Sequence, residues 1–158
     1  MRRSCLMLMT TRILAVLLLL TVALLSGLTR SEQIAMHALS HLDAPYVLGA
    51  AGPARFDCSG LVLHCFQPIG VTLCHSAELI GASEQFLTLT DSSQLRTGDV
   101  VCFDTVGDRD PSDHVGIWLG GNTFVHASSG KEKVIVSELE GYYLEHFSFG
   151  KRIICPWF

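Results

Sequence analysis

One cysteine of this 158-residue sequence lies where a protein would activate a nucleophile. Cys58 follows a glycine-rich loop over 49–53 and begins a segment, 58–67, whose apolar spacing predicts a helix. At a helix N-terminus the unpaired backbone N–H groups and the helix dipole stabilise an anion, and this position can lower the pKa of a thiol. Because the thiolate is the reactive form, Cys58 is a candidate catalytic nucleophile. Simple packing at a helix start is the alternative for this residue taken alone.

Two downstream histidines offer the base that a thiol nucleophile needs. His114 begins one β-rich run, His126 lies near the end of the next, and residues 120–122 between them are typical of a hairpin turn. A three-residue loop pairs Leu119 with Thr123 and places both histidines on one face, whereas an even-numbered loop separates them. One imidazole then acts as base and the second orients it, as in acyl transfer. The alternative is a pair of buried or metal-binding histidines.

The elements that must position these residues fall into two groups. Apolar positions have a helical spacing over 32–43, 58–67 and 76–87. After Gly98 the pattern changes to short β-rich runs, at 100–104, 114–119, 123–127, 133–137 and 152–155. Helices followed by strands predict an α+β domain, with N-terminal helices packed on a small antiparallel β-sheet.

The N-terminal segment has the pattern of an export signal. Three arginines precede an uncharged apolar run, and small residues follow it, as in a secretory signal peptide. The apolar run over 13–28 is shorter than the roughly 20 residues that a spanning helix needs. We therefore expect residues 1–27 to be a signal peptide and residues 28–158 to be the functional domain. The alternative is a retained anchor, which would associate the protein with a membrane; either way the domain is exported, to the periplasm or the cell exterior.

The charge of the remaining domain argues against nucleic acid as a partner, and its cysteines argue against some metal and redox sites. Residues 28–158 keep eight basic and 15 acidic residues, a net charge of −7. Binding to nucleic acid requires clustered lysine and arginine, so we expect no nucleic-acid partner. We also expect the protein to be a monomer. The sequence contains no C-x-x-C pair, which makes a zinc ribbon or a thioredoxin-type site improbable. Cys65 and Cys102 stand among apolar residues and are expected in the core, and no cofactor or metal is expected.

The other histidines have less specific interpretations. His37 and His41 are four residues apart on a predicted helix, a spacing that can hold a metal ion. No glutamate or cysteine nearby completes a site, so we expect both to be exposed. His64 and His75 are expected at the periphery, with His75 a candidate for lining the cleft.

Five segments together resemble the NlpC/P60 family of bacterial cell-wall cysteine peptidases. The segments are PYVLG at 45–49, FDCSGLV at 56–62, TGDVVCF at 97–103, DHVGIWLG at 113–120 and FVHAS at 124–128. Their order is specific, although no single segment would be, and the resemblance covers nearly all of residues 32–153. It implies a papain-like α+β fold and a catalytic domain that acts without a metal or cofactor.

The resemblance also implies roles for individual residues. Cys58 would be the nucleophile, His114 the base and His126 the orienting residue. Tyr46 would lie beside the thiol and Asp57 would flank it. Backbone N–H groups at the start of the helix, including those of Cys58 or Ser59, would hold the oxyanion.

The resemblance implies an activity as well. Enzymes of this family typically cut peptide bonds in peptidoglycan stem peptides, so we expect a cysteine endopeptidase acting on the cell wall. An amidase or acyltransferase with the same fold, or a non-catalytic binding domain, are the alternatives. The sequence departs from the family pattern at Leu48, where an aromatic residue is frequent, and at Ala50, where a glycine is frequent. We expect the stretch 105–112 to form a longer loop beside the site.

Overall fold

The computed structural model describes residues 27–107 and 112–154. The helices are α2 (Arg30–Leu39), α3 (Cys58–Phe66), α4 (Ala77–Ala82) and α5 (Tyr142–Glu145), with 3-10 turns at Gln67–Ile69 and Ser92–Gln94. The strands are β1 (Phe86–Leu89), β2 (Val100–Phe103), β3 (His114–Gly120), β4 (Thr123–Ser128), β5 (Lys133–Glu138) and β6 (Phe147–Ile153). Within the described ranges, no helix is long and apolar enough to cross a membrane. The predicted export segment, 1–27, lies almost entirely outside these ranges.

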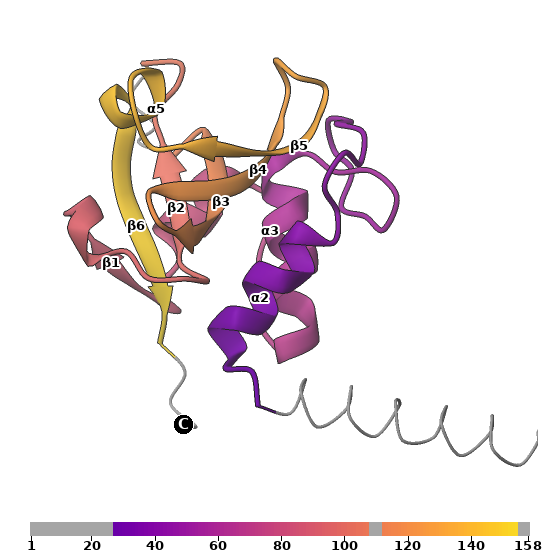
Figure 1. Cartoon of the computed structure of the whole chain (residues 1–158), viewed down its shortest axis with the longest axis horizontal. Coiled ribbons are helices and arrows are strands. Elements are labelled where there is room, and N and C mark those ends of the chain that lie inside the picture. The colour runs from indigo at the N-terminus through magenta and orange to yellow at the C-terminus, as the bar shows by residue number, and fades with distance from the viewer. Residues whose placement is uncertain (1–26, 108–111, 155–158) are drawn as a thin grey trace, which may run out of the picture.

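The six strands form one antiparallel sheet with the order β1-β6-β2-β3-β4-β5. Helix α3 packs against β3 and β4, and α2 packs against α3 and β3. Figure 1 shows these two helices side by side next to the sheet. The predicted α+β class, with N-terminal helices on a small antiparallel sheet, is confirmed.

The first helix begins earlier than the apolar pattern predicted. Thr29 forms a capping box with Glu32, because its side-chain oxygen accepts from the Glu32 N–H at 3.2 Å. In return, the Glu32 carboxylate accepts from the Thr29 N–H at 2.8 Å. These two bonds satisfy N–H groups that a helix start leaves without partners, so α2 starts at Arg30.

The predicted helix over 76–87 is too long. Helix α4 ends at Ala82, and the chain then forms β1, in which Phe86 pairs with Ile153 of β6. A partner from the far end of the sequence decides this segment, so local periodicity misassigns it. Strand β6 likewise starts at Phe147, five residues before the predicted run at 152.

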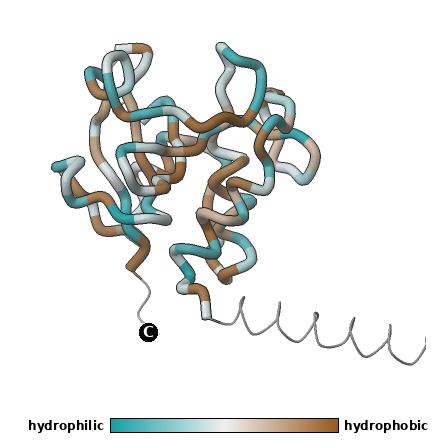
Figure 2. The backbone as a smooth tube through the Cα atoms, in the orientation of Figure 1, coloured by the Kyte–Doolittle hydropathy of each residue, from teal (hydrophilic) through white to brown (hydrophobic). Residues whose placement is uncertain are grey.

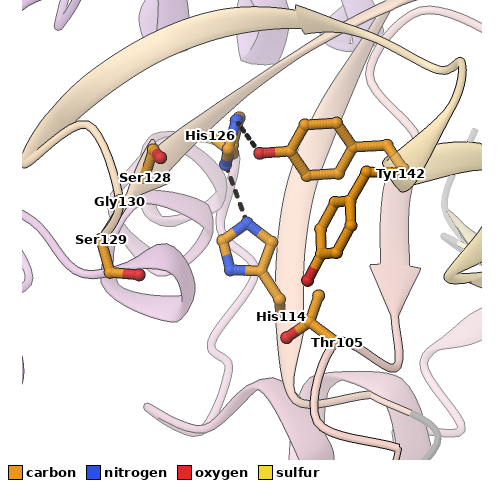
Figure 3. A pocket seen from close by; sticks show the side chains of 8 residues that line it. Thr105, His114, His126, Ser128, Ser129, Gly130 and Tyr142 are labelled. Carbon is orange, nitrogen blue, oxygen red and sulfur yellow. Dashed lines mark hydrogen bonds between the residues drawn. The ribbon is translucent and has the colours of Figure 1, made fainter.

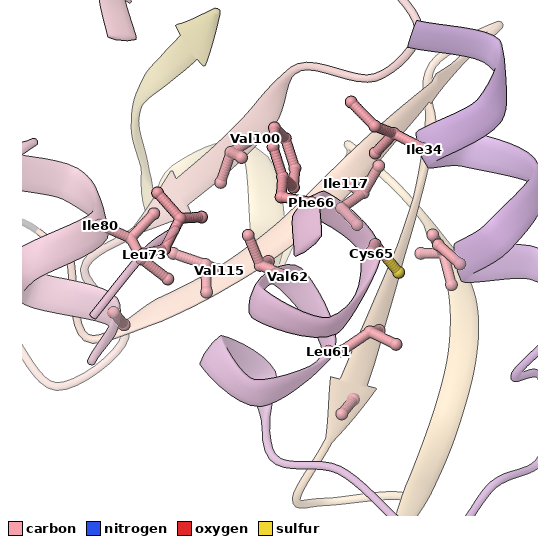
Figure 4. Packing of buried hydrophobic residues seen from close by; sticks show 14 of the residues in the cluster. Ile34, Leu61, Val62, Cys65, Phe66, Leu73, Ile80, Val100, Val115 and Ile117 are labelled. Carbon is pink, nitrogen blue, oxygen red and sulfur yellow. The ribbon is translucent and has the colours of Figure 1, made fainter. Parts of the chain in front are cut away.

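The main core lies between α3 and the sheet. Helix α3 buries Leu61, Val62, Cys65 and Phe66, which follow the predicted helical spacing. Figure 4 shows Val62 and Phe66 near Val115 and Ile117 of β3, and Ile34 of α2 belongs to the same cluster. Burying an aliphatic or aromatic side chain of this kind stabilises the fold by roughly 1.5–3 kcal/mol. Figure 2 shows hydrophobic stretches recurring in the strands and in the helix pair where the two layers meet.

A second core cluster combines residues from β2, β3 and β4 with Leu139, and it includes Phe103, Trp118 and Phe124. Neighbouring residues of β2 divide between the clusters, since Val100 and Cys102 belong to the first and Val101 and Phe103 to the second. This alternation is the two-residue period of a strand buried on both faces. Cys65 and Cys102 are buried, as predicted.

The hairpin between the two candidate histidines differs from its prediction in one detail. Gly120, rather than Leu119, pairs with Thr123, and the register shifts by one residue between Trp118 and Gly120. The loop therefore has two residues, Gly121 and Asn122, both with positive φ (57° and 66°), which suits a tight hairpin turn. A two-residue loop alone would separate the histidines, but the extra residue of the bulge restores the predicted alignment.

Candidate active site

Asp57 fixes the position of the candidate nucleophile at the start of α3. Its carboxylate accepts from the Gly60 N–H at 2.7 Å, the Ser59 hydroxyl at 3.0 Å and the Gly49 N–H at 2.7 Å. His75 Nε2 lies 2.9 Å from the same carboxylate. Burial by itself would raise the pKa of Asp57, but these hydrogen bonds outweigh it and hold the pKa below its usual value. The ionised carboxylate therefore caps α3 and fastens the preceding glycine-rich loop to it.

The loop and the helix start approach too closely for a side chain at Gly60. A Cβ atom there would lie 2.1 Å from the backbone oxygen of Ala50. That same oxygen accepts from the Asp57 N–H at 2.8 Å. The glycine thus allows the loop to lie directly on the first turn of α3, which holds the loop beside the thiol.

The surroundings of the Cys58 thiol oppose its ionisation on balance. Burial raises the pKa of Cys58, and the Asp57 charge raises it further. Hydrogen bonds from the backbone N–H groups of Val115, Ser59 and Cys58 itself lower the pKa, but by less than burial raises it. The lowering that a helix N-terminus can produce is therefore outweighed. The helix N-terminus acts as predicted, but the desolvation that comes with tertiary packing is the larger effect.

The two histidines on the hairpin contact each other directly. His114 Nε2 and His126 Nδ1 are 2.8 Å apart, which confirms that the two side chains share a face (Figure 3). His126 is 1% exposed, and its Nε2 lies 3.0 Å from the Ser137 hydroxyl and 3.3 Å from the Tyr143 hydroxyl. Burial lowers the pKa of His114 to about 4 and that of His126 to about 3. Both imidazoles are therefore neutral near pH 7.

In one tautomeric arrangement of the two histidines, His114 can accept a proton. If His114 donates its Nε2–H to His126 Nδ1, then Nδ1 of His114 carries a free lone pair. His126 must then bear its proton on Nε2, where the Ser137 and Tyr143 hydroxyls can accept it. The surroundings of His126 are thus compatible with a His114 that acts as a base through Nδ1.

Two observations place the thiol near the start of the hairpin. The backbone N–H of Val115, the residue that follows His114, is close enough to the Cys58 sulfur to lower the pKa of the thiol. Cys58 and Asp113 line one pocket, together with Tyr46 and His75. Burial raises the pKa of Tyr46, and the charge of an ionised Cys58 would raise it further. His75 was a candidate for lining the cleft, and it lines this pocket.

The imidazole pair lines a neighbouring pocket. Its other walls include Thr105, Ser128 and Tyr143. Asp113 shapes this side of the site, because its carboxylate accepts from the N–H groups of Thr105 at 2.8 Å and Val106 at 2.6 Å. These bonds hold the start of the predicted loop over 105–112, of which residues 108–111 lie outside the described ranges.

The sequence did not reveal the partners of His126. Ser137 pairs with Phe124 of β4, two positions from His126, so its side chain lies on the same face of the sheet. Knowledge of the β4–β5 register would have been enough to find it. Tyr143 comes from α5, which follows β5 in the chain, and no local pattern predicts its approach.

The structure corrects the interpretation of three other histidines. His37 and His41 were expected to be exposed and His64 to be peripheral, yet all three are half-buried and lie together. Their ring centroids are 4.9–5.1 Å apart. The third histidine comes from α3, so the spacing on the first helix could not reveal it.

The fold, the imidazole pair and the cysteine at the start of α3 define a class of site suited to acyl transfer. The comparisons with known proteins then assign the family: residues 43–152 match the model of the NlpC/P60 family, and the chain belongs to this family. The murein DD-endopeptidase MepH of Escherichia coli is 30% identical over 135 residues, covering 80% of this chain and 48% of that protein. The peptidoglycan endopeptidase RipA of Mycobacterium tuberculosis is 34% identical over 124 residues, covering 70% of this chain and 25% of that protein.

Solved structures support the same fold. NlpC2 from Trichomonas vaginalis superposes with a TM-score of 0.70 at 25% identity, covering 80% of this chain and 47% of that one. The NlpC/p60 domain of the peptidoglycan hydrolase SagA superposes with a TM-score of 0.66 at 25% identity, covering 78% of this chain and 98% of that one. The chain spans less than half the length of both MepH and RipA but nearly all of the isolated SagA domain.

Proposed function

We propose that this chain is a cysteine endopeptidase that hydrolyses peptide bonds in the stem peptides of peptidoglycan. The observation that carries the proposal is the 2.8 Å contact between His114 Nε2 and His126 Nδ1. Cys58 begins α3, and its sulfur lies near the backbone N–H of Val115, the residue that follows His114. Relatives named as murein and peptidoglycan endopeptidases support the substrate class. We assign Cys58 as nucleophile, His114 as general base and His126 as the residue that orients it.

The reaction begins from a neutral thiol and a neutral imidazole. His114 Nδ1 accepts the proton of Cys58 as the sulfur attacks the scissile carbonyl carbon. The carbonyl oxygen becomes an oxyanion, which the backbone N–H groups at the start of α3, including those of Cys58 or Ser59, stabilise. His114 returns the proton to the leaving amine, the C–N bond breaks, and an acyl-enzyme remains. Water, deprotonated by His114, then releases the carboxylic acid and regenerates the thiol.

The supporting residues act on this machinery indirectly. Asp57 caps the helix that carries the nucleophile, and Tyr46 lies on the wall of the same pocket. Leu48, 82% exposed, stands at the mouth of this pocket where the family often has an aromatic residue. We expect its smaller side chain to affect the binding of the stem peptide more than the chemical step.

The proposal includes the location of the enzyme. Residues 1–27 act as a signal peptide or N-terminal anchor, and residues 28–158 form the catalytic domain. The protein is exported to the cell envelope or beyond it, where peptidoglycan is found. It acts as a monomer, needs no nucleic-acid partner, and contacts the membrane only through its N-terminal segment.

Digestion of purified peptidoglycan fragments tests the proposal. The full chain is incubated with defined muropeptides beside the Cys58→Ala variant, and the products are analysed by mass spectrometry. Cys74→Ala is the matched control, because Cys74 is an exposed free thiol outside the pocket that Cys58 lines. New stem-peptide fragments from the parent and the control, but not from Cys58→Ala, would support the endopeptidase and identify the bond.

Two other outcomes would contradict the proposal. Cleavage by Cys58→Ala at the parent rate would exclude this cysteine as nucleophile. An intact substrate with the parent chain would exclude the endopeptidase and would indicate an amidase or acyltransferase that acts on another acyl compound, or a binding domain.

A further inference from the structure

A group of three histidines lies away from the candidate active site, between the two N-terminal helices. His37 is on α2, His41 follows the end of that helix, and His64 is on α3. One ring nitrogen from each can be chosen so that all three lie within 4.8 Å of one another. Each ring is half-buried, so the group is neither a surface cluster nor part of the apolar core.

The packing of the three rings leaves one of their buried nitrogen atoms without a hydrogen-bond partner in the described part of the chain. His41 Nε2 is buried and has no hydrogen-bond partner among the described residues. A buried polar atom without a partner costs about 1–3 kcal/mol, so such an atom normally has a ligand. The His41 ring contacts the ring of Phe56, with centroids 4.7 Å apart, which closes one side of the group to water.

We propose that His37, His41 and His64 form a binding site for a divalent transition-metal ion, with Zn²⁺ as the preferred class. Three imidazole nitrogens at about 2.0–2.1 Å from a tetrahedral Zn²⁺ lie about 3.4 Å apart. The nitrogens therefore need to approach by little more than 1 Å, which small side-chain rotations provide. An all-imidazole set favours zinc, copper or nickel over magnesium or calcium, and the fourth position remains for water or an exogenous ligand.

The site would connect the helix pair to the nucleophile loop. It joins α2 to α3, and Phe56, which packs on both His41 and His64, directly precedes Asp57 and Cys58. A metal ion that binds only the folded state stabilises that state. The free energy of stabilisation grows with the logarithm of the ratio of metal concentration to dissociation constant. The inference does not depend on the proposed peptidase activity.

Metal binding is tested in the full chain carrying Cys58→Ala, because a thiol beside two histidines can itself bind Zn²⁺. Zinc affinity is measured by competition with a chromogenic chelator, and Co²⁺ replaces Zn²⁺ as an absorption probe of coordination. The comparison variant adds His64→Gln. The matched control adds His146→Gln, whose histidine lies at the end of α5 outside the group. Thermal unfolding with and without Zn²⁺ provides a second readout.

We expect one zinc ion per chain, the visible bands of four- or five-coordinate Co²⁺, and a zinc-dependent rise in Tm. His64→Gln should lose these three signals, with an affinity loss above the roughly 10–100-fold typical of a lost second-shell contact. His146→Gln should keep them. Equal zinc affinity in parent and His64→Gln, or no zinc binding by a folded parent, would overturn the proposal. If metal-free circular dichroism shows that His64→Gln is unfolded, His37→Gln decides the question by the same criteria.

Discussion

The charge state of the resting thiol is a sharp prediction of this structure. Many thiol nucleophiles are held as thiolate–imidazolium pairs, but here burial opposes both charges. The pKa of Cys58 is raised above its ordinary 9.0, whereas that of His114 is lowered to about 4. Proton transfer from Cys58 to His114 is therefore unfavourable by at least about five pKa units before the two charges attract each other.

Attraction between the thiolate and the imidazolium does not reverse this preference for the neutral pair. If the thiolate and the imidazolium were about 4 Å apart, their attraction would be about 4 kcal/mol at an effective dielectric constant of 20. That gain equals about three pKa units at 1.36 kcal/mol each. The neutral pair remains favoured by about two units, so about 1% or less of the protein should hold the ion pair near neutral pH. His114 then acts as a general base during attack on the substrate.

The pH dependence of alkylation tests this reasoning. The full chain is treated with iodoacetamide from pH 4 to 10, and mass spectrometry of the peptides separates Cys58 from the exposed Cys74. The rate at Cys58 should rise steadily through the alkaline range without an acid plateau. A plateau between pH 4 and 7 that disappears in His114→Gln would reveal a resting ion pair and refute the argument.

Three further predictions concern the surroundings of the site. Tyr143→Phe and Ser137→Ala each remove a hydroxyl beside His126, and each lost hydrogen bond should cost about 1–2 kcal/mol. We therefore expect kcat to fall about 5–30-fold with KM little changed. A change confined to KM would argue against an orienting role. Asp57→Ala removes the helix cap and the bonds to the loop, so urea unfolding should show a loss of about 2–4 kcal/mol, and an unchanged midpoint would contradict the cap. The pKa values of His114 and His126 are lowered, so the unfolded chain binds more protons between pH 4 and 6.5. Their contribution to stability should be complete above pH 6.5 and decline toward pH 4, and a flat Tm over that interval would exclude neutral buried imidazoles.

Local patterns were sufficient to predict several parts of the molecule. The apolar spacing of 58–67 predicted both α3 and the face that it buries, because a helix repeats every 3.6 residues whatever its neighbours are. The runs at 100–104, 114–119, 123–127 and 133–137 correspond to β2–β5 for the same kind of reason. The shared face of His114 and His126 was also predicted, although the loop is one residue shorter than expected and a bulge compensates.

Other features required partners that are distant in the sequence. Strand β1 forms because Phe86–Leu89 meets β6, and no periodicity within 76–87 indicates this. Ser137 and Tyr143 reach His126 only after β5 and α5 have packed beside it. His64 joins His37 and His41 because α2 packs on α3, which places residues 23 and 27 positions apart side by side.

The sequence by itself thus determined α3 and β2–β5, the candidate nucleophile and the face on which the two hairpin histidines lie, because these depend on short-range geometry and residue type. Tertiary structure alone decided the protonation of the site. A helix start favours the thiolate of Cys58, but burial against the sheet removes the water that would solvate its charge, and the pKa rises. Desolvation depends on all the neighbours of a group in the folded chain, and a local sequence motif does not specify those neighbours.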